Sequence, residues 1–207
     1  MTVNEMGEPS NSQRMKIAYV HDPPNQAGIT THWRNPAFLS KRGFTDLVVA
    51  DQLFGCLSLV MEDAPSTEVS QRLSELNSRI NETLKSGLNA WLMEDLFTLQ
   101  TEVAQSSGGC PHDDETWRSL NTNLHSLFNQ YPDLKGIIFR FGEAFETDPW
   151  ASRINPFSCQ CDVCKRLGKI GALQRIVSEL EEIVCEQLGM YCILRMWDLG
   201  DDGFHAD

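Results

Sequence analysis

The chain has 207 residues, of which 41% are hydrophobic and 22% are charged. This composition suits a globular domain with an apolar core and excludes a collagen-like or wholly disordered chain. Aspartate and glutamate number 29 against 17 lysines and arginines, for a formal charge of −12. A surface this negative repels phosphate backbones and anionic headgroups, so we expect neither nucleic acid nor a membrane as a partner.

The first residues are polar and lack the apolar centre of a secretory signal, and the sequence has no run of about 18 apolar residues. Residues 1–14 are rich in Asn, Ser, Glu and Pro, which predicts a flexible leader before one domain at 15–207. The seven cysteines, an odd number with uneven spacing, favour reduced thiols. We therefore expect a soluble protein of the cytoplasm.

Short apolar runs alternate with longer stretches of helical spacing. In the first part of the chain, Lys16 to His21 and Asp46 to Ala50 predict buried strands, with a short helix between them at residues 35–42. From Ser66 to Ser86, apolar residues recur every three or four positions until Gly87, which predicts an amphipathic helix.

The same alternation continues to the end of the chain. Strands are predicted at Leu88 to Met93, Gly136 to Phe141 and Tyr191 to Met196, separated by helices at residues 114–129 and 171–188. Among the aromatic residues of these elements, Trp91 and Tyr191 are expected in the core.

Strands separated by helices predict an α/β fold with a parallel sheet. We favour a TIM-barrel-like (β/α) domain over an open doubly wound sheet, because no glycine fingerprint follows the first strand and polar residues close every strand. About five strand–helix units are present, whereas a full barrel takes about 250 residues, so we expect an incomplete barrel. A complete small α/β domain is the alternative.

Polar residues gather where the predicted strands end, which is where parallel α/β folds carry their functional groups. Carboxylates and guanidiniums bond hydroxyl groups, and a tryptophan face stacks on a sugar ring. These side chains therefore predict a site for a carbohydrate, and the residues expected to bind it are His21, Asp22, Asp51, Glu94, Asp95, Arg140, Arg195, Trp197 and Asp198.

Glycoside cleavage requires a carboxylic acid to protonate the leaving oxygen and a second carboxylate as base or nucleophile. Glu143 lies two residues beyond the apolar end of the fourth predicted strand and is placed for the first role. Gly142 before it leaves room for a ligand near the backbone. The alternative is a solvated glutamate that pairs with Arg140.

Three stretches resemble barrel glycoside hydrolases of the α-glucuronidase and hexosaminidase-like group: LKGIIFRFGE, GLNAWLMEDLF and ILRMWDLGDDGFHAD, which begin at Leu134, Gly87 and Ile193. The resemblance implies the N-terminal part of a TIM barrel, with Glu143 as general acid and the catalytic base on later strands. Hexosaminidases have an Asp-Glu pair where this chain has Gly142 and Glu143. The α-glucuronidase pattern agrees better, since Arg140 or Arg195 could hold a sugar carboxylate through a bidentate contact.

The sequence SCQCDVCKR brings three cysteines close together, Cys159, Cys161 and Cys164. They could ligate zinc or an iron–sulfur cluster, with a fourth ligand such as Cys110, His112 or Cys185. The alternative is a set of reduced thiols in a long loop. If a metal binds, we expect a structural zinc, as the resemblance to hydrolase-like barrels with cysteine clusters in the same loop implies. The predicted glycoside chemistry requires no cofactor.

Two classes of function follow. The first is a carbohydrate-active hydrolase that cleaves or binds a glycoside, for which the α-glucuronidase resemblance implies a uronic acid. The second is a non-catalytic barrel fragment that binds a carbohydrate or a metal. The residues leave the oligomeric state open.

Overall fold

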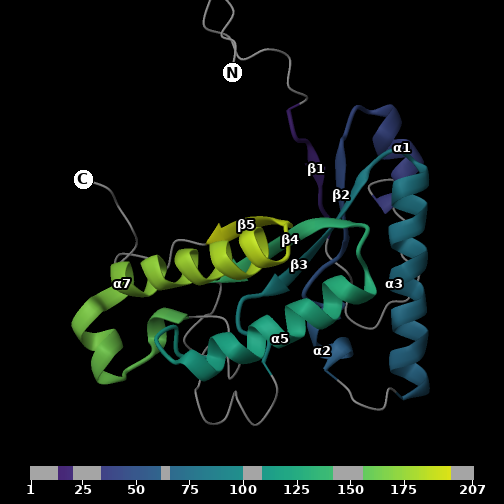
Figure 1. The fold of residues 1–207 in the computed structure, drawn as a ribbon. Coiled ribbons are helices and arrows are strands. Elements are labelled where there is room, and N and C mark those ends of the chain that lie inside the picture. Colours follow the sequence, from purple (N-terminus) through teal and green to yellow (C-terminus); the bar gives the residue numbers. More distant parts are fainter. Residues whose placement is uncertain (1–13, 21–33, 62–65, 100–108, 142–155, 197–207) are drawn as a thin grey trace, which may run out of the picture.

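The computed structural model describes residues 14–20, 34–61, 66–99, 109–141 and 156–196 (Figure 1). Five parallel strands form one sheet, and helices occupy the connections between them. The strands are β1 (Ile17–Ala18), β2 (Asp46–Ala50), β3 (Asn89–Asp95), β4 (Leu134–Phe141) and β5 (Tyr191–Met196). The predicted α/β class and parallel sheet are confirmed.

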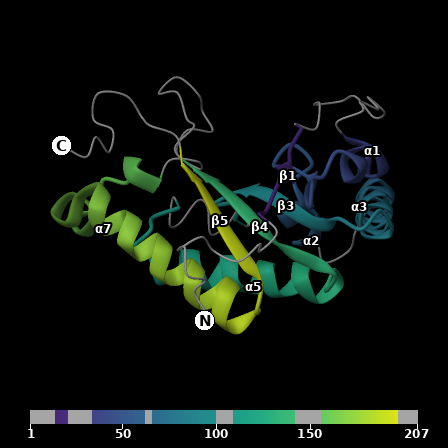
Figure 2. The same ribbon diagram turned by 90° about the horizontal axis from the view of Figure 1, so that it is seen from above.

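The strands lie in the sheet in the same order as in the sequence, from β1 to β5. A doubly wound sheet contains a reversal of strand order, and the described sheet has none. The sheet curls, and the long helices lie together on one face of it (Figure 2). The domain is thus a curled half-barrel with its helices outside.

The described helices include every one that the sequence indicates, and one more at residues 56–60 that was not predicted. They are α1 (Pro36–Lys41), α2 (Cys56–Val60), α3 (Thr67–Lys85), α5 (Asp114–Gln130) and α7 (Asp162–Leu180), followed by a π-helical turn, η3 (Glu181–Gln187); a short 3-10 turn, η2 (Pro156–Ser158), precedes α7. Side chains cap four of the N-termini: Asn35, Ser66, Asp113 and Cys161 accept hydrogen bonds from backbone N–H groups of the first turn. In the described residues, no helix is long and apolar enough to cross a membrane.

Several boundaries differ from the prediction, and among them β4 begins at Leu134 instead of Gly136. Strand β1 is shorter, and β3 continues through Asp95, so Glu94 and Asp95 belong to the strand. Helix α7 begins at Asp162 instead of residue 171. Gly168 has a non-helical backbone there (φ 64°, ψ −169°), and this kink shifts the phase of the apolar pattern. Periodicity therefore reveals only the part of the helix that follows the kink.

The two faces of the sheet carry different apolar clusters, because successive residues of a strand point to opposite faces. On the outer face, Ala90 and Leu92 of β3 pack with the helices in the large core. On the inner face, Trp91 and Met93 belong to a smaller cluster. Trp91 is fully buried, as predicted, but Tyr191 is 54% exposed. The core prediction for Tyr191 is wrong because β5 is the last strand of the described sheet.

The inner face of β3, β4 and β5 is built in three layers of residues in register. The layers are Trp91, Gly136 and Tyr191; then Met93, Ile138 and Ile193; then Asp95, Arg140 and Arg195. The indole of Trp91 and the ring of Tyr191 come within 6.2 Å of each other, centroid to centroid. The absence of a side chain at Gly136 makes this approach possible, and the third layer lies at the carboxyl ends of the strands.

Candidate functional site

The candidate site begins with a polar row on the inner face, formed by Asp95, Arg140 and Arg195. We call it the Asp95–Arg140–Arg195 row. The guanidinium Nε of Arg140 donates to Oδ1 of Asp95 at 2.7 Å. The two side chains are only 12% and 21% exposed, so this pair is less screened by water than a surface ion pair. The sequence placed all three residues at strand ends, and the structure brings them together.

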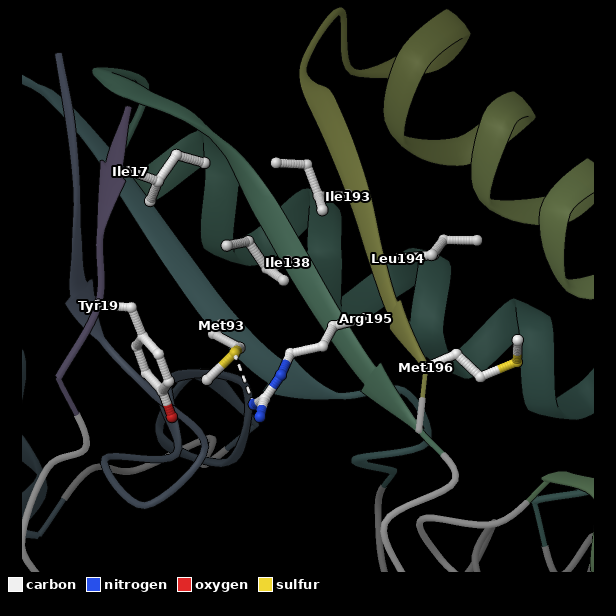
Figure 3. Close-up of a pocket in the computed structure, with 8 residues that line it drawn as sticks. All are labelled: Ile17, Tyr19, Met93, Ile138, Ile193, Leu194, Arg195 and Met196. Atoms are coloured by element: carbon white, nitrogen blue, oxygen red, sulfur yellow. Dashed lines mark hydrogen bonds between the residues drawn. The ribbon is translucent and has the colours of Figure 1, made fainter. Parts of the chain in front are cut away.

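Arg195 extends from β5 across the inner face toward β1 (Figure 3). Its guanidinium lies 5.6 Å from the ring centroid of Tyr19, and its Nη1 is 3.8 Å from the sulfur of Met93. These side chains border an open hollow of about 410 Å³, lined by Ile17, Tyr19, Met93, Ile138, Ile193, Leu194, Arg195 and Met196. The hollow therefore combines an apolar floor with one cationic group.

Asp51 lies beyond the end of β2 and is fully buried. Its Oδ2 accepts a hydrogen bond from the Tyr19 hydroxyl at 3.4 Å, and its Oδ1 accepts one from the backbone N–H of Leu53 at 3.0 Å. The carboxylate holds the turn after β2 and orients the phenol that stands beside Arg195. Asp51 thus does not line the hollow itself but holds Tyr19, which does.

Glu94 lies next to Asp95 in the chain but on the other face of the sheet. It is 1% exposed, and its Oε1 accepts a hydrogen bond from the backbone N–H of Leu57 at the start of α2, at 3.2 Å. Burial raises the pKa of this carboxyl to about 8. The structure does not bring Glu94 into the Asp95–Arg140–Arg195 row. Its contacts fasten α2 to the outer face of β3.

The other residues predicted for this site lie outside the described residues. They are Glu143, the predicted general acid, and the predicted carbohydrate-binding residues His21, Asp22, Trp197 and Asp198.

A second candidate site is the four-cysteine cluster of Cys110, Cys159, Cys161 and Cys164, whose sulfur atoms all lie within 4.8 Å of one another. The sulfur of Cys110 is 3.7 Å from that of Cys161 and 3.6 Å from that of Cys164. The structure thus selects Cys110 among the three fourth ligands that the sequence allowed. Cys185, in η3, is exposed and is not part of the cluster.

Local structure positions the cluster at the N-termini of two neighbouring helices. Cys110 precedes α5, where the indole N–H of Trp117 donates to the carbonyl of Pro111 at 2.8 Å. Cys161 is the N-cap of α7, and its sulfur accepts the backbone N–H of Cys164 at 3.4 Å. A bound cation would therefore join the two connections that follow β3 and β4.

The thiols of the cluster differ in environment. Burial raises the pKa of Cys110 to about 11 and raises that of Cys164 as well. The backbone N–H of Cys164 lowers the pKa of the exposed Cys161 to about 7. The cluster thus sets an easily ionised thiol beside two buried ones, and a cation at its centre would favour the thiolate form of all.

Sequence reasoning missed Tyr19 and Met93 as residues of the hollow. The available signal was alternation: Ile17 and Tyr19 in the first predicted strand, and Trp91 and Met93 in the third, share the face of Asp95.

Comparison of the chain with models of protein families gave no match, and a search of curated proteins found no relative.

The raised pKa of Glu94 predicts a pH dependence of stability. The folded state binds the proton more tightly than the unfolded chain, so the free energy of unfolding should fall as pH rises from about 4.5 to about 8. Between pH 5 and pH 8.5 this fall in the free energy of unfolding is on the order of 4 kcal/mol. It should disappear in Glu94→Gln, whose amide oxygen still accepts the Leu57 N–H.

Urea denaturation at pH 5 and pH 8.5 measures the effect. Glu68→Gln, at an exposed position in the first turn of α3, is the control and should behave as the unmodified chain does. An unchanged pH dependence in Glu94→Gln would show that the buried carboxyl does not cause it.

Proposed function

We propose that this chain is the N-terminal part of a TIM-barrel-like, carbohydrate-active protein of the hydrolase type, which binds a sugar at the carboxyl ends of its strands. The observation that carries the proposal is the Asp95–Arg140–Arg195 row, three polar side chains in register on three neighbouring strands. Such groups match a ring with several hydroxyl groups, because the carboxylate accepts and the guanidiniums donate hydrogen bonds.

The charge of the row favours an acidic sugar. The row contains two guanidinium groups and one carboxylate, so it is a locally cationic place in a chain whose formal charge is −12. A uronic acid offers a planar carboxylate that a guanidinium binds through two parallel hydrogen bonds. We assign the sugar carboxylate to Arg195, because its side chain lines the hollow and that of Arg140 does not.

For catalysis, we propose that Glu143 protonates the glycosidic oxygen as the bond breaks. The assignment is supported by sequence position. Glu143 lies three residues after Arg140 in the sequence and two residues beyond Phe141, the last residue of β4. The second carboxylate that hydrolysis requires is, by resemblance, expected on later strands. A barrel fragment that binds the sugar without hydrolysing it remains the second candidate function.

Calorimetric titration with glucuronic acid and with glucose tests this site. We expect glucuronic acid to bind more tightly than glucose, and Arg195→Gln to weaken glucuronic acid binding roughly 10- to 100-fold, the value of a charge-assisted hydrogen bond. Arg175→Gln, on the helical face, is the matched control. Equal binding of both sugars, or no effect of Arg195→Gln, would contradict the assignment. Release of the aryl alcohol from an aryl glucuronide would separate an enzyme from a binding protein.

We also propose that the four-cysteine cluster holds a structural zinc ion. A tetrahedral site with Zn–S bonds of about 2.3 Å requires sulfur atoms about 3.8 Å apart. The measured separations of 3.7 Å and 3.6 Å come close to this value before any rearrangement. Four thiolates complete the coordination of zinc, so the proposed ion has a structural role.

Metal binding is tested by adding Co²⁺ or Zn²⁺ to the chelator-treated protein. Co²⁺ should give the absorption of a tetrahedral thiolate site, and Zn²⁺ should raise the unfolding temperature. Both effects should be lost in Cys110→Ser and Cys164→Ser and kept in Cys185→Ser and His112→Ala. Retention of the cobalt spectrum in Cys110→Ser would refute the four-sulfur assignment.

A further inference from the structure

The thiols of the four-cysteine cluster differ in their access to solvent. Cys110 and Cys164 are buried, Cys159 is partly exposed, and Cys161 is exposed. A small oxidant that arrives from solvent therefore meets the sulfur of Cys161 before it meets the two buried ones. Because oxidation of a thiol depends on its exposure, Cys161 is the residue at which the cluster is open to oxidation.

The exposed sulfur has a buried partner within reach. The sulfur atoms of Cys110 and Cys161 are 3.7 Å apart. A disulfide bond is about 2.05 Å long, so the two atoms must approach each other by about 1.7 Å. This displacement is smaller than the one that a change of side-chain rotamer produces. The two cysteines are 51 residues apart in the sequence and follow different strands, β3 and β4.

The other close pair of the cluster is less accessible. Cys164 lies 3.6 Å from Cys110, sulfur to sulfur, but both residues are buried. The backbone N–H of Cys164 donates to the sulfur of Cys161 at 3.4 Å, which holds that sulfur at the start of α7. The pair of Cys110 and Cys161 thus combines an exposed sulfur with a measured close approach.

We propose that the four-cysteine cluster is a site of reversible oxidation, at which a hydroperoxide converts Cys110 and Cys161 into a disulfide. The sulfur of Cys161 attacks one oxygen of the hydroperoxide. The O–O bond breaks, an S–O bond forms, and the thiol proton leaves with the other oxygen. The sulfur of Cys110 then attacks that of Cys161. The S–S bond forms, and the S–O bond breaks as the hydroxyl leaves with the Cys110 proton as water. The two sulfur atoms are oxidised, and the hydroperoxide takes up both electrons.

The disulfide and a four-sulfur metal site exclude each other. A structural zinc needs four thiolates, and the disulfide removes two of them. The oxidised cluster still joins the connections that follow β3 and β4, but through a bond that a dithiol can reverse. The inference rests on the proposed zinc only where it predicts release of the ion, because formation of the disulfide requires the sulfur atoms alone.

Hydrogen peroxide added to the chelator-treated full chain tests the disulfide. Mass spectrometry of unreduced peptides should show Cys110 linked to Cys161, with the loss of two hydrogen atoms that dithiothreitol restores. The link should also form in Cys164→Ser, which loses the metal, and should be absent from Cys161→Ser. Cys185→Ser removes an exposed thiol outside the cluster and is the matched control.

The peptides of the unmodified chain decide the outcome, since they depend on no variant being folded. A chain whose cluster stays reduced in peroxide overturns the proposal. So does a chain in which Cys161 is linked to any cysteine other than Cys110.

The zinc-loaded chain tests the exclusion of metal by the disulfide. Peroxide should release the ion, measured with a colorimetric chelator, and dithiothreitol should restore binding. An oxidised chain that carries the disulfide and keeps its zinc contradicts the exclusion. A chain that binds no zinc but forms the Cys110–Cys161 link supports the oxidation site and refutes the metal. Binding of zinc without formation of the link refutes the oxidation site alone.

Discussion

The inner face depends on the close approach of three strands at Gly136. A Cβ atom at this position would lie 2.1 Å from the carbonyl oxygen of Tyr191 and 2.8 Å from Cζ3 of Trp91. Glycine therefore allows β4 to lie between these two residues. Because side chains alternate along a strand, a slip of one residue would turn Arg140 toward the helices and break its pair with Asp95. The strand register at Gly136 thus determines which side chains face inward at the Asp95–Arg140–Arg195 row, two layers further along the strands.

The same alternation gives neighbouring carboxylates different roles. Asp95 faces inward and pairs with Arg140, whereas Glu94 faces outward and binds the start of α2. Asp46 of β2 accepts the indole N–H of Trp91 at 2.8 Å, which holds the ring that packs beside Gly136. An acidic chain therefore uses some of its carboxyl groups inside the fold, to fix the strands and the turn after β2.

Much of the fold can be predicted from the sequence because its signals are local. Capping residues and apolar periodicity indicate α3 and α5 nearly to the residue. The candidate site is predicted less completely, since it depends on which strands are neighbours and which face each residue takes. Strand ends indicated Asp95, Arg140 and Arg195, but only the sheet order places them in one row. Likewise, spacing left three fourth ligands open, and only the packing of α5 beside α7 selects Cys110.

The four-cysteine cluster and the polar row belong to the same edge of the sheet, where β3 and β4 end and the connections to α5 and α7 begin. Phe97, just after β3, packs edge-on against Trp117 of α5 with ring centroids 5.5 Å apart. Aromatic packing thus holds the connection that carries Cys110. The proposed zinc would add a covalent link between the same two βα units.

The most direct test of this account is the unfolding free energy of Gly136→Ala compared with that of Gly87→Ala. Gly87 has φ of +76° and open space around it, so its substitution should cost about 1 kcal/mol from backbone strain alone. Gly136→Ala should cost roughly 2 to 4 kcal/mol, because the new methyl group meets backbone on the neighbouring strand. Equal losses in the two variants would contradict the claim that close packing at Gly136 sets the register of the inner face.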